Sequence, residues 1–205
     1  MPFVADAGAL ITDGQGTLIT SRSCLLNPNR NPINVTEEFI EREIGKLGIR
    51  HTIWLQGDPS EPVTSGHVDG YVLFNAPGAV LVEACDDEKI EPPMWRSHDI
   101  ATLEQATDAA KRTLDVETIL APRKRYWKFC GEMFAPCYVN AYIANGAVIT
   151  ARFGDVQRDE AAKSVLERAF PGREVVMLQV DHIAAGGGGV HCLTQPMSTS
   201  DGAIR

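Results

Sequence analysis

The chain has 205 residues, of which 44% are hydrophobic and 22% are charged, a composition typical of a globular protein with a hydrophobic core. The formal net charge of −8 argues against a nucleic-acid-binding surface, which needs clustered Lys and Arg side chains. No stretch approaches about twenty uninterrupted apolar residues, and the N-terminus lacks the pattern of a signal peptide, so no membrane span is expected.

The cysteines give no sign of a disulfide framework. Their number is odd, their spacing is irregular, and no two form a CxxC pair. Such usage favours a reducing compartment, so we expect a soluble, cytoplasmic protein. The five cysteines are Cys24, Cys85, Cys130, Cys137 and Cys192.

Internal repetition is the most informative feature of the chain. A β-branched, apolar phrase follows a turn glycine three times and predicts three buried strands. The three phrases are Gly16–Thr20, Gly78–Val82 and Gly146–Thr150.

An amphipathic helix is predicted after each phrase, with capping residues and glycine or proline stops. The first runs over 37–47, with Thr36 as N-cap, Gly48 as stop, and inward-facing Phe39, Ile40, Ile44 and Leu47. The second runs near 100–114, with Asp99 as its cap. The third begins after Asp159, buries Val165, Leu166, Ala169 and Phe170, and ends at Pro171-Gly172.

Each helix is followed by two further predicted strands, so a unit reads strand, helix, strand, strand with a period of roughly 65 residues. The third elements are expected at 52–55, 117–120 and 175–178, and the closing strands at 66–72, 137–143 and 188–194. If the units surround a common axis, their closing strands bring polar residues to one central site. Those residues are His67 and Asp69, Asn140, and His191 with Cys192.

His67 and Asp69 are two residues apart, which on a strand places both side chains on one face. Gly66 and Gly70 flank them and leave room for close approach. One interpretation is a solvent-facing polar pair on an edge strand. The other is a general acid/base beside a carboxylate that binds a cation.

Cys192 is the candidate nucleophile because it follows a glycine loop and His191 at the repeat position that also carries His67. A thiolate needs a partner that takes its proton or stabilises its charge, and His67 is the candidate. A buried structural cysteine is the plainer alternative. No cysteine and histidine spacing fits a zinc site, and no glycine motif fits a phosphate cradle, so we expect neither a metal site nor a phosphate-binding loop.

The four-glycine run over 186–189 has two interpretations. It is either a flexible turn or a place where bare backbone approaches a ligand. We include Gly189, together with Asn140, among the candidate substrate-binding residues.

Two phrases, Gly66-His-Val-Asp-Gly70 and Gly186-Gly-Gly-Gly-Val-His-Cys-Leu-Thr-Gln195, resemble those of the agmatine deiminase and bacterial peptidylarginine deiminase family. Further matches cover nearly the whole chain and occur with the expected separations. They are Cys24–Pro32, Tyr138–Gly146 and Phe153–Asp155.

The resemblance implies an α/β class, the α/β propeller (pentein) fold of ββαβ-type repeats, with about three of its five units present here. It also implies cofactor-free hydrolysis of a small cationic guanidinium substrate through a covalent thiouronium intermediate on Cys192. His67 then protonates the leaving ammonia and activates water, and Asp69 binds the guanidinium through charge-assisted hydrogen bonds.

The chain departs from the family pattern in two ways. Asp6-Ala7-Gly8 stands where the family usually has Glu-Gly-Gly, so Asp6 is a candidate substrate-binding residue with a shorter reach. Family members are also longer and carry a Trp-x-Arg-Asp phrase in an N-terminal portion that this chain lacks. We therefore interpret residues 1–205 as a single C-terminal portion of such a domain, completed by an N-terminal segment or by a homo-oligomer.

Agmatine, converted to N-carbamoylputrescine and ammonia, is the expected substrate. Peptidylarginine deimination and amidine transfer to an amine remain alternatives within the same cysteine chemistry. A non-catalytic propeller fragment that binds a partner is the alternative from another class.

Overall fold

The computed structural model describes residues 2–87 and 94–195. Two compact units are distinguished along the chain, Met1–Val82 with Pro92–Glu117 and Glu83–Glu91 with Thr118–Arg205. In the described part of the chain, no helix is both long and apolar enough to cross a membrane.

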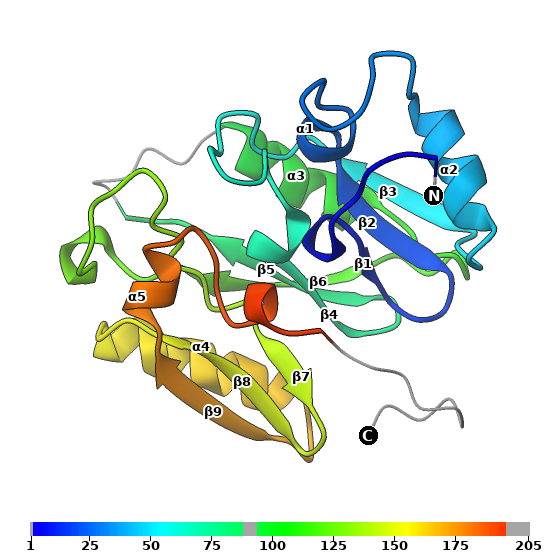
Figure 1. The fold of residues 1–205 in the computed structure, drawn as a ribbon. Helices are drawn as coiled ribbons and strands as arrows, with labels where there is room; N and C mark the ends of the chain where they lie inside the picture. Colours follow the sequence, from blue (N-terminus) through cyan, green and yellow to red (C-terminus); the bar gives the residue numbers. More distant parts are fainter. Residues whose placement is uncertain (1, 88–93, 196–205) are drawn as a thin grey trace. The chain divides into compact units, whose positions relative to one another are not determined.

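The strands form three sheets of three strands each, ordered β1-β2-β3, β4-β5-β6 and β7-β8-β9 (Figure 1). Their bounds are β1 Ile11–Thr12, β2 Thr17–Ser21, β3 His51–Leu55, β4 Val72–Ala76, β5 Ala79–Ala84, β6 Asp115–Leu120, β7 Tyr142–Ala144, β8 Ala147–Arg152 and β9 Glu174–Gln179. The three glycine phrases therefore form the central strands β2, β5 and β8, as predicted.

One long helix follows each central strand, and short helices occupy the connections. The α-helices are α1 Arg22–Leu25, α2 Glu37–Gly45, α3 Met94–Gln105, α4 Val156–Ala169 and α5 Asp181–Ala184. The 3-10 helices are η1 Ala7–Ala9, η2 Val68–Gly70, η3 Lys124–Tyr126 and η4 His191–Leu193. In the third sheet, α4 lies along one face of β8 and β9 (Figure 1).

Strand directions follow one pattern around the central strands. β2 pairs antiparallel with β1 and parallel with β3, and β8 pairs in the same way with β7 and β9. Parallel pairing of neighbouring strands requires a crossover, which α2 and α4 provide. Two-residue turns join β4 to β5 and β7 to β8, where Gly78 and Gly146 have left-handed φ angles of 79° and 77°.

The closing strands predicted at 66–72 and 137–143 are strands only at their ends, Val72 in β4 and Tyr142 and Ile143 in β7, and the one predicted at 188–194 is wrong. Residues 66–71 form a turn and η2, and residues 191–193 form η4. Where a strand follows such a segment, as β4 and β7 do, it is the antiparallel first strand of the next sheet. A unit therefore reads strand, strand, helix, strand.

The first helix confirms its predicted start, because the Thr36 hydroxyl accepts a hydrogen bond from Phe39 N at 3.2 Å. Ile40 and Ile44 are buried, but Leu47 lies beyond the end of α2 and is 69% exposed, so its assignment to the core is wrong.

The other two helices begin earlier than predicted. α3 begins before residue 100, and Asp99 lies inside it, fully buried, where it accepts hydrogen bonds from Gln56 N, Gly57 N and the Tyr71 hydroxyl. α4 begins at Val156, so Asp159 lies within its first turn.

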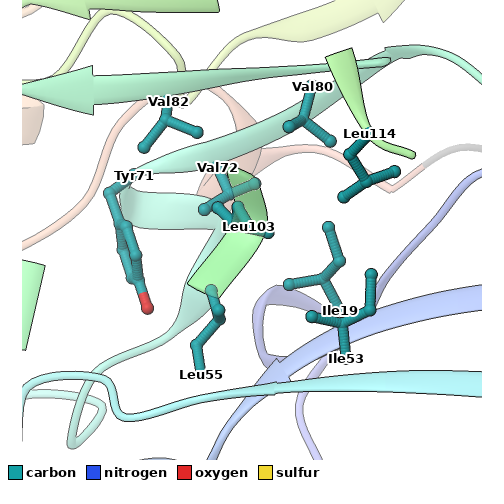
Figure 2. Packing of buried hydrophobic residues seen from close by; sticks show 9 residues of the cluster. All are labelled: Ile19, Ile53, Leu55, Tyr71, Val72, Val80, Val82, Leu103 and Leu114. Carbon is teal, nitrogen blue, oxygen red and sulfur yellow. The ribbon is translucent and has the colours of Figure 1, made fainter. Parts of the chain in front are cut away.

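A hydrophobic core in the first unit joins the first two sheets. Figure 2 shows Ile19, Ile53 and Leu55 of β2 and β3 facing Val72, Val80 and Val82 of β4 and β5. Leu103 of α3 completes this cluster, and a second cluster packs α2 through Ile40 and Ile44. The segment that carries His67 and Asp69 thus directly precedes β4, a strand that this core holds in place.

Two substitutions, one within α2 at Ile44 and one beyond its end at Leu47, test which of these residues belongs to the core. We expect Ile44→Ala to lower the free energy of unfolding by about 2–5 kcal/mol, because it leaves a cavity. Leu47→Ala, which removes exposed apolar surface, should change it by no more than about 0.5 kcal/mol. Urea unfolding measures both variants, and equal losses would contradict this packing.

Candidate active site

The candidate residues occur at corresponding points of the repeat. Asp6 and His67 are the N-cap residues of η1 and η2, and Cys192 lies within η4. Two of these 3-10 helices precede the first strand of a sheet, η1 before β1 and η2 before β4. The repetition predicted from the sequence is therefore present, although the residues lie on turns instead of strands.

The candidates are divided between the two units. Asp6, His67 and Asp69 belong to the first unit, and Asn140, Gly189 and Cys192 belong to the second. Each group forms its own connected cluster, and the two are described separately.

In the first unit, the His67 imidazole lies between two carboxylates. Its Nε2 atom is 3.1 Å from Asp6 Oδ2, and its Nδ1 atom is 3.9 Å from Asp69 Oδ1. The side chains of His67 and Asp69 are only 13% and 5% exposed, whereas that of Asp6 is 51% exposed. An imidazole oriented by carboxylates is suited to transfer protons.

Arg30 is a site component that the sequence analysis did not single out. Its Nη1 atom donates to Asp6 Oδ2, and its Nη2 atom donates to Thr64 O at 3.2 Å. Burial tends to raise the pKa of Asp6, but the hydrogen bonds and charges of Arg30 and His67 outweigh burial and lower it. Asp6 therefore remains ionised. In the sequence, Arg30 was signalled only by its position within the Cys24–Pro32 segment.

Cys24 lies beside this cluster but is unsuited to be a nucleophile. It is fully buried, and burial raises the pKa of its thiol to about 11, with smaller influences from Arg30 and the nearby carboxylates. The thiol stays protonated near neutral pH.

Gly8 packs directly against the histidine and the aspartate. A Cβ atom at this position would lie 2.6 Å from His67 Nδ1 and 2.8 Å from both carboxylate oxygens of Asp69. Such distances are shorter than van der Waals contact, so only glycine fits without displacing the two side chains. The backbone of η1 therefore forms one wall of this cluster.

In the second unit, Cys192 is exposed and is held by Asn140. Asn140 Nδ2 donates to the Cys192 sulfur at 3.3 Å, and Asn140 Oδ1 accepts from Cys192 N at 3.4 Å. The backbone carbonyl of Asn140 also accepts from His191 N at 3.2 Å. The Cys192 thiol also lies 3.5 Å from Asn140 Oδ1, to which it can donate, so the Asn140 amide offers the sulfur both a donor and an acceptor.

The glycine run lies close against this pair. A Cβ atom at Gly189 would lie 2.5 Å from Asn140 Oδ1, and one at Gly188 would lie 3.2 Å from the Cys192 sulfur. The backbone of the run therefore packs closely against Asn140 and Cys192, and its approach to a ligand stays a prediction.

A buried glutamate, Glu83, holds the backbone of the two residues that precede Asn140. Glu83, at 1% exposure, accepts hydrogen bonds from Tyr138 N at 2.8 Å and Val139 N at 3.1 Å. The Tyr138 hydroxyl donates to Asp159 at 2.7 Å. Glu83 was not predicted from the sequence, although a charged residue directly after the apolar Gly78–Val82 segment was a detectable signal.

Three comparisons relate the chain to known proteins. A family model described as Porphyromonas-type peptidyl-arginine deiminase matches residues 1–197. An agmatine deiminase from Medicago truncatula is 39% identical over 213 residues, which cover 94% of this chain and 56% of that protein. The solved agmatine deiminase of Enterococcus faecalis matches with a TM-score of 0.84 and 28% identity, covering 95% of this chain and 57% of that one.

A further solved structure, an agmatine deiminase of C. jejuni, has a TM-score of 0.77 at 22% identity and covers 94% of this chain and 56% of that one, which supports the fold. The repeated sheets and these neighbours define the class of protein, an α/β propeller of the pentein type. The chain belongs to the Porphyromonas-type peptidyl-arginine deiminase family. It spans a little more than half the length of the relatives it matches.

Substitutions at Gly8 and at Gly70, which flanks the His67–Asp69 segment, test the packing around His67. We expect Gly8→Ala to lower the free energy of unfolding by about 1–3 kcal/mol, because the methyl group overlaps His67 and Asp69. Gly70→Ala is the matched control, since a methyl group there would have no atom within 4 Å and the φ of Gly70 is ordinary. It should change stability by no more than about 0.5 kcal/mol. Equal effects in urea unfolding would contradict the close packing at Gly8.

Proposed function

We propose that this protein hydrolyses the guanidinium group of agmatine, giving N-carbamoylputrescine and ammonia. The observation that carries the proposal is the exposed Cys192 thiol with the Asn140 amide donor at its sulfur. The similarity to proteins named agmatine deiminase supports the choice of substrate.

The first half of the proposed reaction forms a covalent intermediate. The Cys192 sulfur bonds to the guanidinium carbon, and His67 gives a proton to one terminal nitrogen. The bond from carbon to that nitrogen then breaks, ammonia leaves, and an S-alkylthiouronium group remains on Cys192.

The second half consumes water. His67 takes a proton from a water molecule, whose oxygen bonds to the thiouronium carbon. The carbon–sulfur bond then breaks and the remaining hydroxyl proton passes to the departing sulfur, which releases the neutral ureido product and leaves Cys192 as a thiol. His67 gives up one proton in the first half and takes up one in the second, so it ends in the protonation state in which it began.

Two aspartates have distinct proposed roles. Asp69, almost fully buried, is suited to accept hydrogen bonds from guanidinium N–H groups. Asp6 Oδ2 already contacts His67 and Arg30, which favours an orienting role for Asp6 in addition to the predicted contact with substrate. Asn140 and Gly189 are proposed to border the substrate next to Cys192.

Peptidyl-arginine is the second candidate substrate, because the matching family model is described by that activity. The same atoms of Cys192 and His67 would act on either guanidinium group. The two substrates differ in whether the site admits a peptide backbone. We further propose that the protein acts in the cytoplasm, since all five of its cysteines are free.

Product assays with two cysteine variants test the proposal. We expect the purified chain to form ureido product from agmatine, and Cys192→Ala to abolish it because no nucleophile remains. Cys130→Ala is the matched control, since Cys130 is the other exposed cysteine and should be dispensable. A parallel assay with an arginine-containing peptide distinguishes the two substrates.

Absence of product from the parent chain with both substrates would contradict activity of these 205 residues. Retention of product by Cys192→Ala would contradict the role of this cysteine.

A further inference from the structure

The loop that precedes His67 is organised around one carboxylate, that of Glu61. Its oxygen atoms accept hydrogen bonds from Val63 N at 2.8 Å, Thr64 N at 2.5 Å, the Thr64 hydroxyl at 2.5 Å and Gly66 N at 3.3 Å. A carboxylate offers about four acceptor positions, and four donors converge on this one. Residues 61–67 are called the Glu61 loop below.

Thr64 connects Glu61 to His67. Its hydroxyl donates its single proton to Glu61 and accepts a hydrogen bond from His67 N at 3.1 Å. Only a group that is both donor and acceptor can make these two contacts at once. The backbone of His67 is thereby linked to the Glu61 carboxylate through two consecutive hydrogen bonds that share the Thr64 hydroxyl.

Three carbonyl groups of the Glu61 loop accept hydrogen bonds from side chains outside the loop. The Ser21 hydroxyl donates to Gly66 O at 2.6 Å, and the Ser23 hydroxyl donates to Ser65 O at 2.7 Å. Arg30, the partner of Asp6, donates to Thr64 O. The loop is thus fixed by two sets of hydrogen bonds. Glu61 accepts from its N–H and hydroxyl groups, and Ser21, Ser23 and Arg30 donate to its carbonyl groups.

The charge of Glu61 is maintained by the same contacts. Burial tends to raise the pKa of Glu61, but the hydrogen bonds from Thr64, Val63 and Gly66 outweigh burial and lower it. The carboxylate is therefore ionised at neutral pH and can accept from all four donors.

We propose that Glu61, acting through Thr64, is a positioning residue that holds the His67 imidazole in place against Asp6. The inference rests on the proposed function for its catalytic consequence, because a displaced imidazole transfers protons poorly. Its structural part, the placement of the ring beside Asp6, can be tested without any turnover.

The same loop region offers a matched control. Asp58 lies three residues before Glu61, and among the residues that the structure describes its side chain accepts hydrogen bonds from Ser60 alone, from the amide at 2.9 Å and the hydroxyl at 2.6 Å. Asp58→Asn therefore removes a nearby charge of the same sign without touching the contacts of Thr64 or His67.

Four variants of the full chain separate positioning from general stability. Glu61→Gln keeps the side-chain shape but places an amide against four donors, and Thr64→Val removes the hydroxyl at nearly constant shape. Thr64→Ser restores the hydroxyl, and Asp58→Asn is the control. The first measurement is the 15N chemical shift of His67 Nε2, the atom that contacts Asp6, by NMR, with resonances assigned through His67→Asn.

We expect Glu61→Gln and Thr64→Val to shift the His67 Nε2 resonance, and Thr64→Ser and Asp58→Asn to leave it unchanged. Where agmatine is turned over, kcat should fall about tenfold in the first two variants with KM unchanged, and Thr64→Ser should recover it. The Glu61→Gln, Thr64→Val double variant should lose no more than the worse single variant, because both break one connected path.

An unchanged His67 resonance in Glu61→Gln and Thr64→Val, or an equal shift in Asp58→Asn, would overturn the inference. Absence of agmatine turnover in the parent chain would contradict the proposed function but not the positioning role of Glu61. The His67 Nε2 resonance tests that role without turnover.

Discussion

Parallel pairing of β2 with β3 and of β8 with β9, the strands that follow helices α2 and α4, is the constraint from which the arrangement of the candidate site follows. In the first sheet the register runs from Thr17 opposite His51 to Ser21 opposite Leu55, and in the third from Ala147 opposite Glu174 to Arg152 opposite Gln179. Because these pairs are parallel, a helix must cross over between them. The chain then leaves each sheet at a fixed end.

The end of a central strand is also where the supporting contacts of the site originate. Ser21, the last residue of β2, holds Gly66 in front of His67, and Glu83, near the end of β5, holds Tyr138 and Val139 in front of Asn140. The two anchors differ in chemistry: a hydroxyl donates to a carbonyl in one case, and a carboxylate accepts from amides in the other. In both cases a residue of a buried strand holds the backbone just before a polar side chain of the candidate site, so the strand determines where that side chain lies.

Sequence reasoning succeeded where the signal is local and repeated. The phrases beginning at Gly16, Gly78 and Gly146 are strands because β-branched residues follow a turn glycine, and Thr36 caps α2 as its hydroxyl predicts. The candidate residues His67, Asp69 and Cys192 were found through the same repetition. Their chemical roles remain proposals.

The errors arose where contacts between distant parts of the chain decide the structure. Asp99 resembles a helix cap, but its partners Gln56, Gly57 and Tyr71 lie at least 28 residues away in the chain. The segment from His67 to Gly70 has the alternation of a strand, yet Glu61 and Ser21 fix it as a turn that enters η2. Arg30 and Glu83 could be recognised as components of the site only after their partners were located.

Trapping the covalent intermediate tests the central claim, that Cys192 attacks the guanidinium carbon, most directly. The parent chain and His67→Asn, in which release by water should be slowed, are mixed with agmatine, quenched in acid and mapped by peptide mass spectrometry. The account predicts an adduct of agmatine less one ammonia on the peptide containing Cys192, and none on the peptide containing Cys130. An adduct confined to another residue, or none on Cys192 in either protein, would contradict it.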